Sequence, residues 1–202
     1  LLFVMLVPWL LALDAQRSWG STLGVAWGMA VAYTGAAFFW FGAAIGGYTQ
    51  IGTAAGIGVL LVLAPLFQPQ FIAFALARRW MGQRHGPWLR ALAGTAAWLT
   101  TETLLPRVLD DTLGYGLHPS RLLRQAADLG GVAGLTLMLL LANEAVLIAI
   151  QRRSSGARAL ARPLAGAAVV PLLLAAYGLA ALAPTTPAGA PTLRMGLVQS
   201  NI

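Results

Sequence analysis

The sequence predicts an all-α polytopic membrane protein, built as a bundle of about six transmembrane helices. Hydrophobic residues make up 58% of its 202 residues, and its mean hydropathy is +0.75. Several apolar runs approach the ~20 residues that a helix needs to cross the hydrocarbon core of a bilayer. These runs are continuous, whereas the strands of a membrane β-barrel alternate between apolar and polar residues.

The composition also excludes several kinds of chemistry. The chain has no cysteine, and all 13 of its basic residues are arginine. Disulfides, thiolate metal sites, a cysteine nucleophile and lysine catalysis are therefore excluded within these 202 residues. The net charge of +7 does not indicate nucleic-acid binding, because the arginines lie between apolar runs, where membrane topology accounts for them. We predict no cofactor, no metal site and no nucleic-acid partner.

Six apolar runs are expected to cross the membrane, with short polar segments between them. The first would measure only about 20 Å as a helix, so we interpret it as the tail of a truncated span. The expected spans are 1–13, 20–45, 51–77, 88–105, 131–150 and 163–182.

Glycines recur at every fourth residue along parts of the second run. They fall at Gly20, Gly24 and Gly28, and again at Gly42 and Gly46. Small residues at this spacing allow two membrane helices to approach closely. The pattern therefore predicts a tight seam between helices.

Prolines and glutamines interrupt the third run. As one helix this run would measure about 40 Å, which exceeds the hydrocarbon core, so a tilt or a kink is expected at Pro65 and Pro69. Gln68 and Gln70 lie in the same stretch. Glutamines buried in such a run can hydrogen-bond across helices, which is a packing role.

The distribution of charge predicts which side of the membrane each loop faces. Segments 78–90 and 152–162 carry arginines with no acidic residue among them, which favours the cytoplasmic side. The loop 106–130 lies between them and balances three arginines with three aspartates. It is expected to face outward and to concentrate the polar chemistry of the chain.

Glu102 is a carboxylate inside the apolar run 88–105. Ionisable residues within a membrane are costly and suggest a functional role. The alternative is that Glu102 lies at the membrane edge, where water or Arg107 satisfies it. Trp98 precedes Glu102 by four residues, so the two side chains are expected to share one face of a helix.

The order of these motifs resembles the membrane domain of the bacterial apolipoprotein N-acyltransferase family. The resemblance rests on Trp98 and Glu102 in a late span, a Leu-Gly-Tyr loop at 113–115, the segment 124–131 and Asn143. The sequence Val-Pro-Trp-Leu at 7–10 is similar to the end of an early span in that family. Many members carry an arginine three residues after the glutamate, where this chain has Leu105, so no arginine role is transferred.

The resemblance implies a domain plan. Residues 1–183 would form the transmembrane domain and 184–192 a linker. Residues 193–202, which include Met-Gly-Leu-Val-Gln-Ser-Asn-Ile, are similar to the opening strand of an α/β nitrilase-like domain. That domain would lie outside the cytoplasm and would continue past residue 202, so we interpret the chain as a fragment of a longer protein.

The resemblance also implies an activity for the full-length protein. Such enzymes of the bacterial inner membrane move an acyl chain from a phospholipid donor to a diacylglyceryl apolipoprotein acceptor. A Glu–Lys–Cys triad in the nitrilase-like domain forms a thioester during this transfer, and no residue of this chain is assigned a catalytic role. We expect six residues to contact lipid or the catalytic domain, and these are Trp98, Glu102, Arg107, Arg124, Gln125 and Asp128.

Two readings from other classes of protein remain open. In a transporter or channel subunit, Glu102 and the aspartates of the outer loop would line a pathway. Many transporters are built from repeated halves, and we find no convincing internal repeat. In a non-catalytic anchor, the helices would only hold an extracytoplasmic domain. The sequence that follows Ile202 would distinguish these readings.

Overall fold

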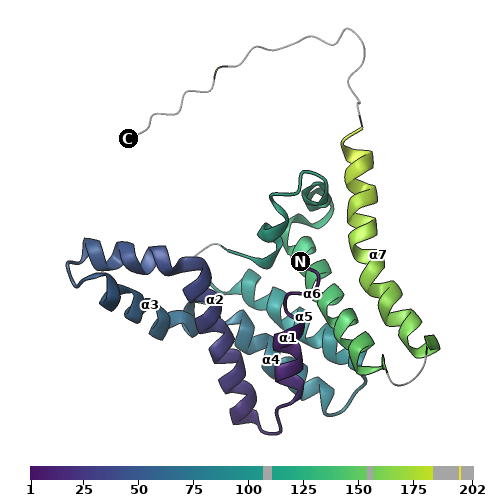
Figure 1. The fold of residues 1–202 in the computed structure, drawn as a ribbon, viewed down its shortest axis with the longest axis horizontal. Coiled ribbons are helices and arrows are strands. Elements are labelled where there is room, and N and C mark those ends of the chain that lie inside the picture. Colours follow the sequence, from purple (N-terminus) through teal and green to yellow (C-terminus); the bar gives the residue numbers. More distant parts are fainter. Residues whose placement is uncertain (107–110, 154–156, 184–195, 197–202) are drawn as a thin grey trace.

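The computed structural model describes residues 1–106, 111–153, 157–183 and 196, and within these residues it is helical, with no strand. Helix follows helix along the chain (Figure 1). In order, the elements are α1 (Val7–Asp14), α2 (Trp19–Tyr48), α3 (Thr53–Phe67), α4 (Gln70–Gly82), α5 (Pro87–Leu104), the 3₁₀ turns η1 (Leu113–Leu117) and η2 (Leu123–Ala126), α6 (Ala127–Gln151) and α7 (Ala157–Ala181).

The bundle has a centre and two flanks (Figure 1). α1, α4, α5 and α6 form its centre, where α4 packs on α5 and α6 contacts both α1 and α5. On one side, α7 packs against α6 and η2. On the other side, α3 runs back along the second half of α2, and these two helices project from the centre as a hairpin.

Aromatic side chains fill the core of the bundle. Trp98 of α5 packs edge-on against Phe71 and Phe74 of α4, with ring centroids 4.8 Å and 5.8 Å apart. Trp9 of α1 contacts the same two rings, at 5.5 Å and 5.3 Å. Large aromatic side chains bury much apolar surface and favour edge-to-face or offset-stacked geometry, and the Trp9–Phe74 pair is stacked. This cluster therefore fixes how α1, α4 and α5 pack together.

The glycine seam predicted along α2 is present in its second half. A Cβ atom on Gly42 would lie 2.8 Å from Ile57 Cα, and one on Gly56 would lie 2.3 Å from the Gly42 carbonyl oxygen. The backbones of α2 and α3 therefore touch. The same prediction was wrong at Gly20, Gly24 and Gly28, where no atom lies within 4 Å of an added Cβ. That face of α2 has no packing partner in the described part of the chain.

The third apolar run is broken at Pro69, as predicted, whereas Pro65 lies inside α3. α3 ends at Phe67 and α4 begins at Gln70, with a bend of 42° between the two helices. Proline disfavours the helical conformation of the residue before it, and Gln68, which precedes Pro69, has φ −127° and ψ 54°. The break turns the Gln68 side chain into the interior, where it is fully buried.

Among the described residues, three helical segments are long and apolar enough to cross a membrane, or four if the bent pair is one span. These are Trp19–Tyr48, Leu123–Gln151, Leu160–Ala181 and the pair Thr53–Phe67 with Gln70–Gly82. α1 has eight residues, about 12 Å of helix, so it does not cross a ~30 Å core alone. Residues 2–6 form turns and not the first half of a span. The count of six spans therefore stays a prediction.

Asn143 of α6 attaches the first residues of the chain to the bundle. Its Oδ1 accepts a hydrogen bond from the Leu6 backbone N–H at 2.8 Å. Its Nδ2 donates to the carbonyl oxygens of Leu2 at 2.9 Å and Leu139 at 2.8 Å. Leu6 caps the N-terminus of α1, where backbone N–H groups lack partners within the helix. A side chain from a distant helix supplies one of these partners.

The described part of the loop between α5 and α6 folds into two 3₁₀ turns and then enters α6. The first turns of α6 are broken at Gly130 and Gly131, and Gly131 has a φ of 63°. The apolar part of the helix follows this break, as predicted for 131–150. The predicted linker 184–192 lies outside the described residues, as does the predicted strand 193–202 apart from Gly196.

Candidate functional site

Trp98 and Glu102 lie one turn apart on the buried face of α5. Trp98 is 2% exposed and Glu102 is 7% exposed, which confirms that the two side chains share a face. Trp98 belongs to the aromatic core, whereas Glu102 lies in the last turn of the helix. Glu102 is therefore a buried carboxylate next to the polar loop between α5 and α6.

A relay of hydroxyl groups leads to the Glu102 carboxylate. The Thr112 hydroxyl donates to Glu102 Oε2 at 3.0 Å, and the oxygens of the Thr112 and Thr136 hydroxyls are 2.7 Å apart. The Gly114 backbone N–H donates to Thr136 Oγ1 at 3.0 Å. A hydroxyl carries one proton, so Thr136 donates to Thr112 in this arrangement. The relay joins α5, the loop and α6.

Asp111 is the centre of a second polar group. The Tyr33 hydroxyl of α2 donates to Asp111 Oδ2 at 2.9 Å. Gln68 Nε2 donates to the two Asp111 oxygens at 3.0 Å and 3.2 Å, and Gln70 Nε2 donates to Gln68 Oε1. The break before α4 therefore presents an amide to the loop carboxylate. The sequence predicted bonds across helices for the two glutamines, whereas Gln68 bonds to the loop and Gln70 bonds to Gln68.

Two cavities open beside these groups. One has a volume of about 260 Å³ and is lined by Glu102, Thr112 and Val132, among others. The other has a volume of about 340 Å³, and Arg124, Gln125 and Val132 are among its lining residues. Val132 lines both cavities, so the Glu102 carboxylate and the polar loop residues lie on adjoining hollows beside the break in α6.

The remaining candidate residues lie on the loop. Arg124 is exposed, and its Nη1 donates to the His118 carbonyl oxygen at 3.2 Å. Gln125 Nε2 donates to the Arg121 carbonyl oxygen at 2.9 Å. Asp128 is exposed, and Tyr177 of α7 donates to its Oδ2 at 3.5 Å. Arg107 lies outside the described residues.

Three members of these two polar groups were not predicted from the sequence. Tyr33, Thr112 and Thr136 lie in segments whose pattern gave no reason to single them out. Sequence reasoning also missed a cluster of charges at the far end of α4, where Arg78 contacts both Asp14 and Glu144. Asp14 at the end of a helix and Glu144 late in an apolar run could have indicated this cluster, because a buried charge requires a partner.

The side chains of the described residues determine which chemistry this region can support. Within the described ranges, no group of three or more His, Cys, Asp or Glu is placed to hold a metal ion. The chain has neither cysteine nor lysine, so the site offers no thiolate or amine nucleophile. It offers two hydrogen-bonded carboxylates, loop donors and adjoining hollows, which suits binding and positioning.

Taken together, the apolar helices and the buried polar groups define a multi-pass helical membrane protein. A family model, the apolipoprotein N-acyltransferase N-terminal domain, matches residues 1–145. The chain belongs to this family, which confirms the resemblance seen in the sequence. A comparison with curated proteins and a comparison with solved structures each gave no match.

Proposed function

We propose that this chain is the membrane part of an apolipoprotein N-acyltransferase. The full-length enzyme would transfer an acyl chain from a phospholipid to the amino group of the lipid-modified N-terminal cysteine of a lipoprotein. The observation that carries this proposal is the family match over residues 1–145. The match includes α5, the outer loop and most of α6, so it contains both carboxylates of the candidate site.

In the proposed enzyme, acyl transfer and the holding of its substrates belong to two different parts. Acyl transfer through a thioester needs a thiolate nucleophile, a base and a group that stabilises the oxyanion. The resemblance assigns these roles to a Cys, a Glu and a Lys in a domain after residue 202. The membrane part would then hold the phospholipid donor and the lipoprotein acceptor in the bilayer and support that domain.

In this proposal the site residues position groups and do not react. Trp98 holds α5 against α4 through the aromatic core, and Glu102 holds the end of α5 against the loop through the hydroxyl relay. Arg124 and Gln125 line the larger hollow. Together with Asp128 and Arg107, they would contact lipid or the catalytic domain. The enzyme would be located in the bacterial inner membrane, with the loop and the C-terminus outside the cytoplasm.

The test is acyl transfer by the full-length protein in vesicles. A phospholipid with a labelled acyl chain is the donor, and a peptide with a diacylglyceryl cysteine at its N-terminus is the acceptor. We expect labelled peptide from the full-length protein and none from residues 1–202 alone. We also expect none after the predicted cysteine of the following domain is replaced by alanine. An unlabelled peptide with folded full-length protein would contradict the proposal.

A further inference from the structure

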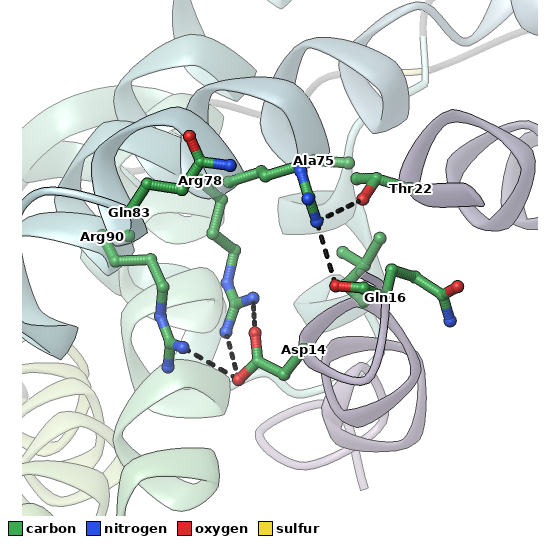
Figure 2. A pocket seen from close by; sticks show the side chains of 10 residues that line it. Asp14, Gln16, Thr22, Ala75, Arg78, Gln83 and Arg90 are labelled. Atoms are coloured by element: carbon green, nitrogen blue, oxygen red, sulfur yellow. Dashed lines mark hydrogen bonds and ion pairs between the residues drawn. The ribbon is translucent and has the colours of Figure 1, made fainter. Parts of the chain in front are cut away.

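A charged cavity lies at the opposite end of α4 and α5 from Glu102. Its volume is about 250 Å³, and its lining includes Asp14, Arg78, Arg79 and Arg90 (Figure 2). Arg90 and Glu102 lie on the same helix, about 18 Å apart along its axis at 1.5 Å per residue. This cavity is therefore separate from the candidate site of the outer loop, and its interpretation does not depend on the proposed function.

Two of the three arginines are bound to carboxylates. Arg78 contacts both Asp14 and Glu144, and Arg90 Nη1 donates to Asp14 Oδ2 at 2.9 Å. Figure 2 shows Arg78 and Arg90 converging on Asp14. Three guanidinium groups, counting Arg79, therefore face two carboxylates, which leaves the cluster with one excess positive charge.

The excess charge belongs to Arg79, whose partners are all neutral. Its Nη1 donates to the Gln16 carbonyl oxygen at 3.0 Å and to Thr22 Oγ1 at 3.1 Å, and its Nη2 donates to the Arg17 carbonyl oxygen at 2.7 Å. Its guanidinium carbon lies 5.2 Å from the centroid of the Trp19 ring. Among the described residues, no carboxylate forms an ion pair with it.

The cavity arginines also retain unused hydrogen-bond donors. Arg79 Nε and Arg90 Nε are both buried, and neither has a hydrogen-bond partner among the residues that the structure describes. Buried polar groups are bonded in most proteins, so each exception calls for an explanation. Arg79 is already held by three hydrogen bonds and an aromatic face, so binding an anion would require little further ordering of its side chain.

Exposed tryptophans surround this end of the bundle. Trp19 starts α2, Trp80 lies near the end of α4, and Trp88 starts α5, and all three side chains are exposed. Tryptophan is enriched at the level of the lipid headgroups, where its ring meets apolar chains and its N–H meets water. The cavity therefore lies at the depth where phospholipid headgroups are found.

We propose that this cavity binds the phosphodiester group of a phospholipid headgroup. A phosphodiester carries one negative charge, which matches the one excess positive charge of the cluster. The planar fork of an arginine suits phosphate oxygens, and juxtamembrane arginines attract anionic lipids. Arg79 is the principal residue of the site, and Arg90 supplies the second donor. Free phosphate shares this chemistry, so the test separates the two sources.

The test measures the melting temperature of the full-length protein in detergent against increasing ligand. The three probes are dioctanoyl phosphatidylglycerol, dioctanoylglycerol, which has the same chains without phosphate, and sodium phosphate. A ligand that binds the folded state raises the melting temperature. We expect phosphatidylglycerol to raise it. In Arg79→Gln we expect the half-maximal shift to need about tenfold more lipid or greater, because a charge-assisted hydrogen bond is lost.

Arg84→Gln is the matched control, because Arg84 lies over the exposed Trp80 ring at 5.3 Å and does not line the cavity. It should respond to lipid as the unmodified protein does. If Arg79→Gln does not fold, Arg79→Lys, which keeps the charge without the fork, should still weaken the response. An equal response to sodium phosphate that depends on Arg79 would support the site with soluble phosphate as its ligand. A response to dioctanoylglycerol equal to that of phosphatidylglycerol, or no effect of either Arg79 variant, would overturn the proposal.

Discussion

Arg78 and Glu144 form a two-point ion pair that joins α4 to α6 inside the bundle. Arg78 Nε donates to Oε1 at 2.5 Å, and Nη2 donates to Oε2 at 3.1 Å. Arg78 is 2% exposed and Glu144 is fully buried. Removing two charges from water costs several kcal/mol per ion, and only close geometry with additional hydrogen bonds offsets that cost. Asp14 supplies the additional bonds to Arg78.

The first prediction concerns this ion pair. Glu144→Ala should destabilise the protein by roughly 3–5 kcal/mol, because it leaves a buried guanidinium without one of its two carboxylates. Thermal or denaturant unfolding in detergent measures the change. Asp128→Ala is the control, since Asp128 is exposed, and it should change stability by less than about 0.5 kcal/mol. Equal stabilities of the two variants would show that the ion pair contributes nothing to the free energy of unfolding.

The second prediction concerns Glu102. Glu102→Gln keeps an acceptor for the Thr112 hydroxyl but removes the charge, so the protein should stay folded while acyl transfer falls about tenfold. Turnover of the labelled phospholipid and the melting temperature measure these two effects separately. Thr101→Val is the control, because the Thr101 hydroxyl bonds within its own helix, to the Ala97 carbonyl oxygen. Normal turnover in Glu102→Gln would contradict this role and would favour the alternative that Glu102 only lies at the membrane edge.

The third prediction concerns the contact between α2 and α3. Gly56→Ala would place a Cβ atom 2.3 Å from the Gly42 carbonyl oxygen, so the two helices must separate. Such overpacking costs about 1–3 kcal/mol. Gly58→Ala on the same helix is a close control, since no atom lies within 4 Å of its added Cβ. The melting temperature should fall in Gly56→Ala and not in Gly58→Ala, and equal values would contradict the close contact.

The fourth prediction concerns orientation. The chain has no native cysteine, so a single introduced cysteine reports its own location. Ser120→Cys on the outer loop should react in intact cells with a thiol reagent that does not cross membranes. His85→Cys, an exposed position between α4 and α5, should react only after the cells are opened. The reverse pattern would overturn the assignment based on arginine, and the location of the proposed enzyme with it.

The local features of this fold could be predicted from its sequence. Pro69 predicted the break before α4, and Gly42 and Gly46 predicted the seam with α3. The spacing of Trp98 and Glu102 predicted their common face. Each of these rests on the geometry of one short segment, in which nearby residues determine the outcome.

The contacts between distant segments could not be predicted in the same way. The segment 78–90 contains no acidic residue, so its arginines suggested only a loop at the cytoplasmic side. Arg78 in fact turns inward, because Asp14 and Glu144 lie next to it in space. Both carboxylates are more than 60 positions away in sequence. Thr112 and Thr136 are likewise brought to Glu102 by tertiary packing. A single sequence carries no periodicity that reports such pairs.

The bond between Leu6 and Asn143 has a consequence for how the protein is made. The two residues are 137 positions apart, so the ribosome completes α1 long before α6 exists. Until then the N–H at the start of α1 lacks its side-chain acceptor, and a backbone donor without a partner is costly in lipid. The first helix can therefore reach its final place only after the sixth is inserted. The contact between α1 and α6 is therefore made late in the assembly of the bundle.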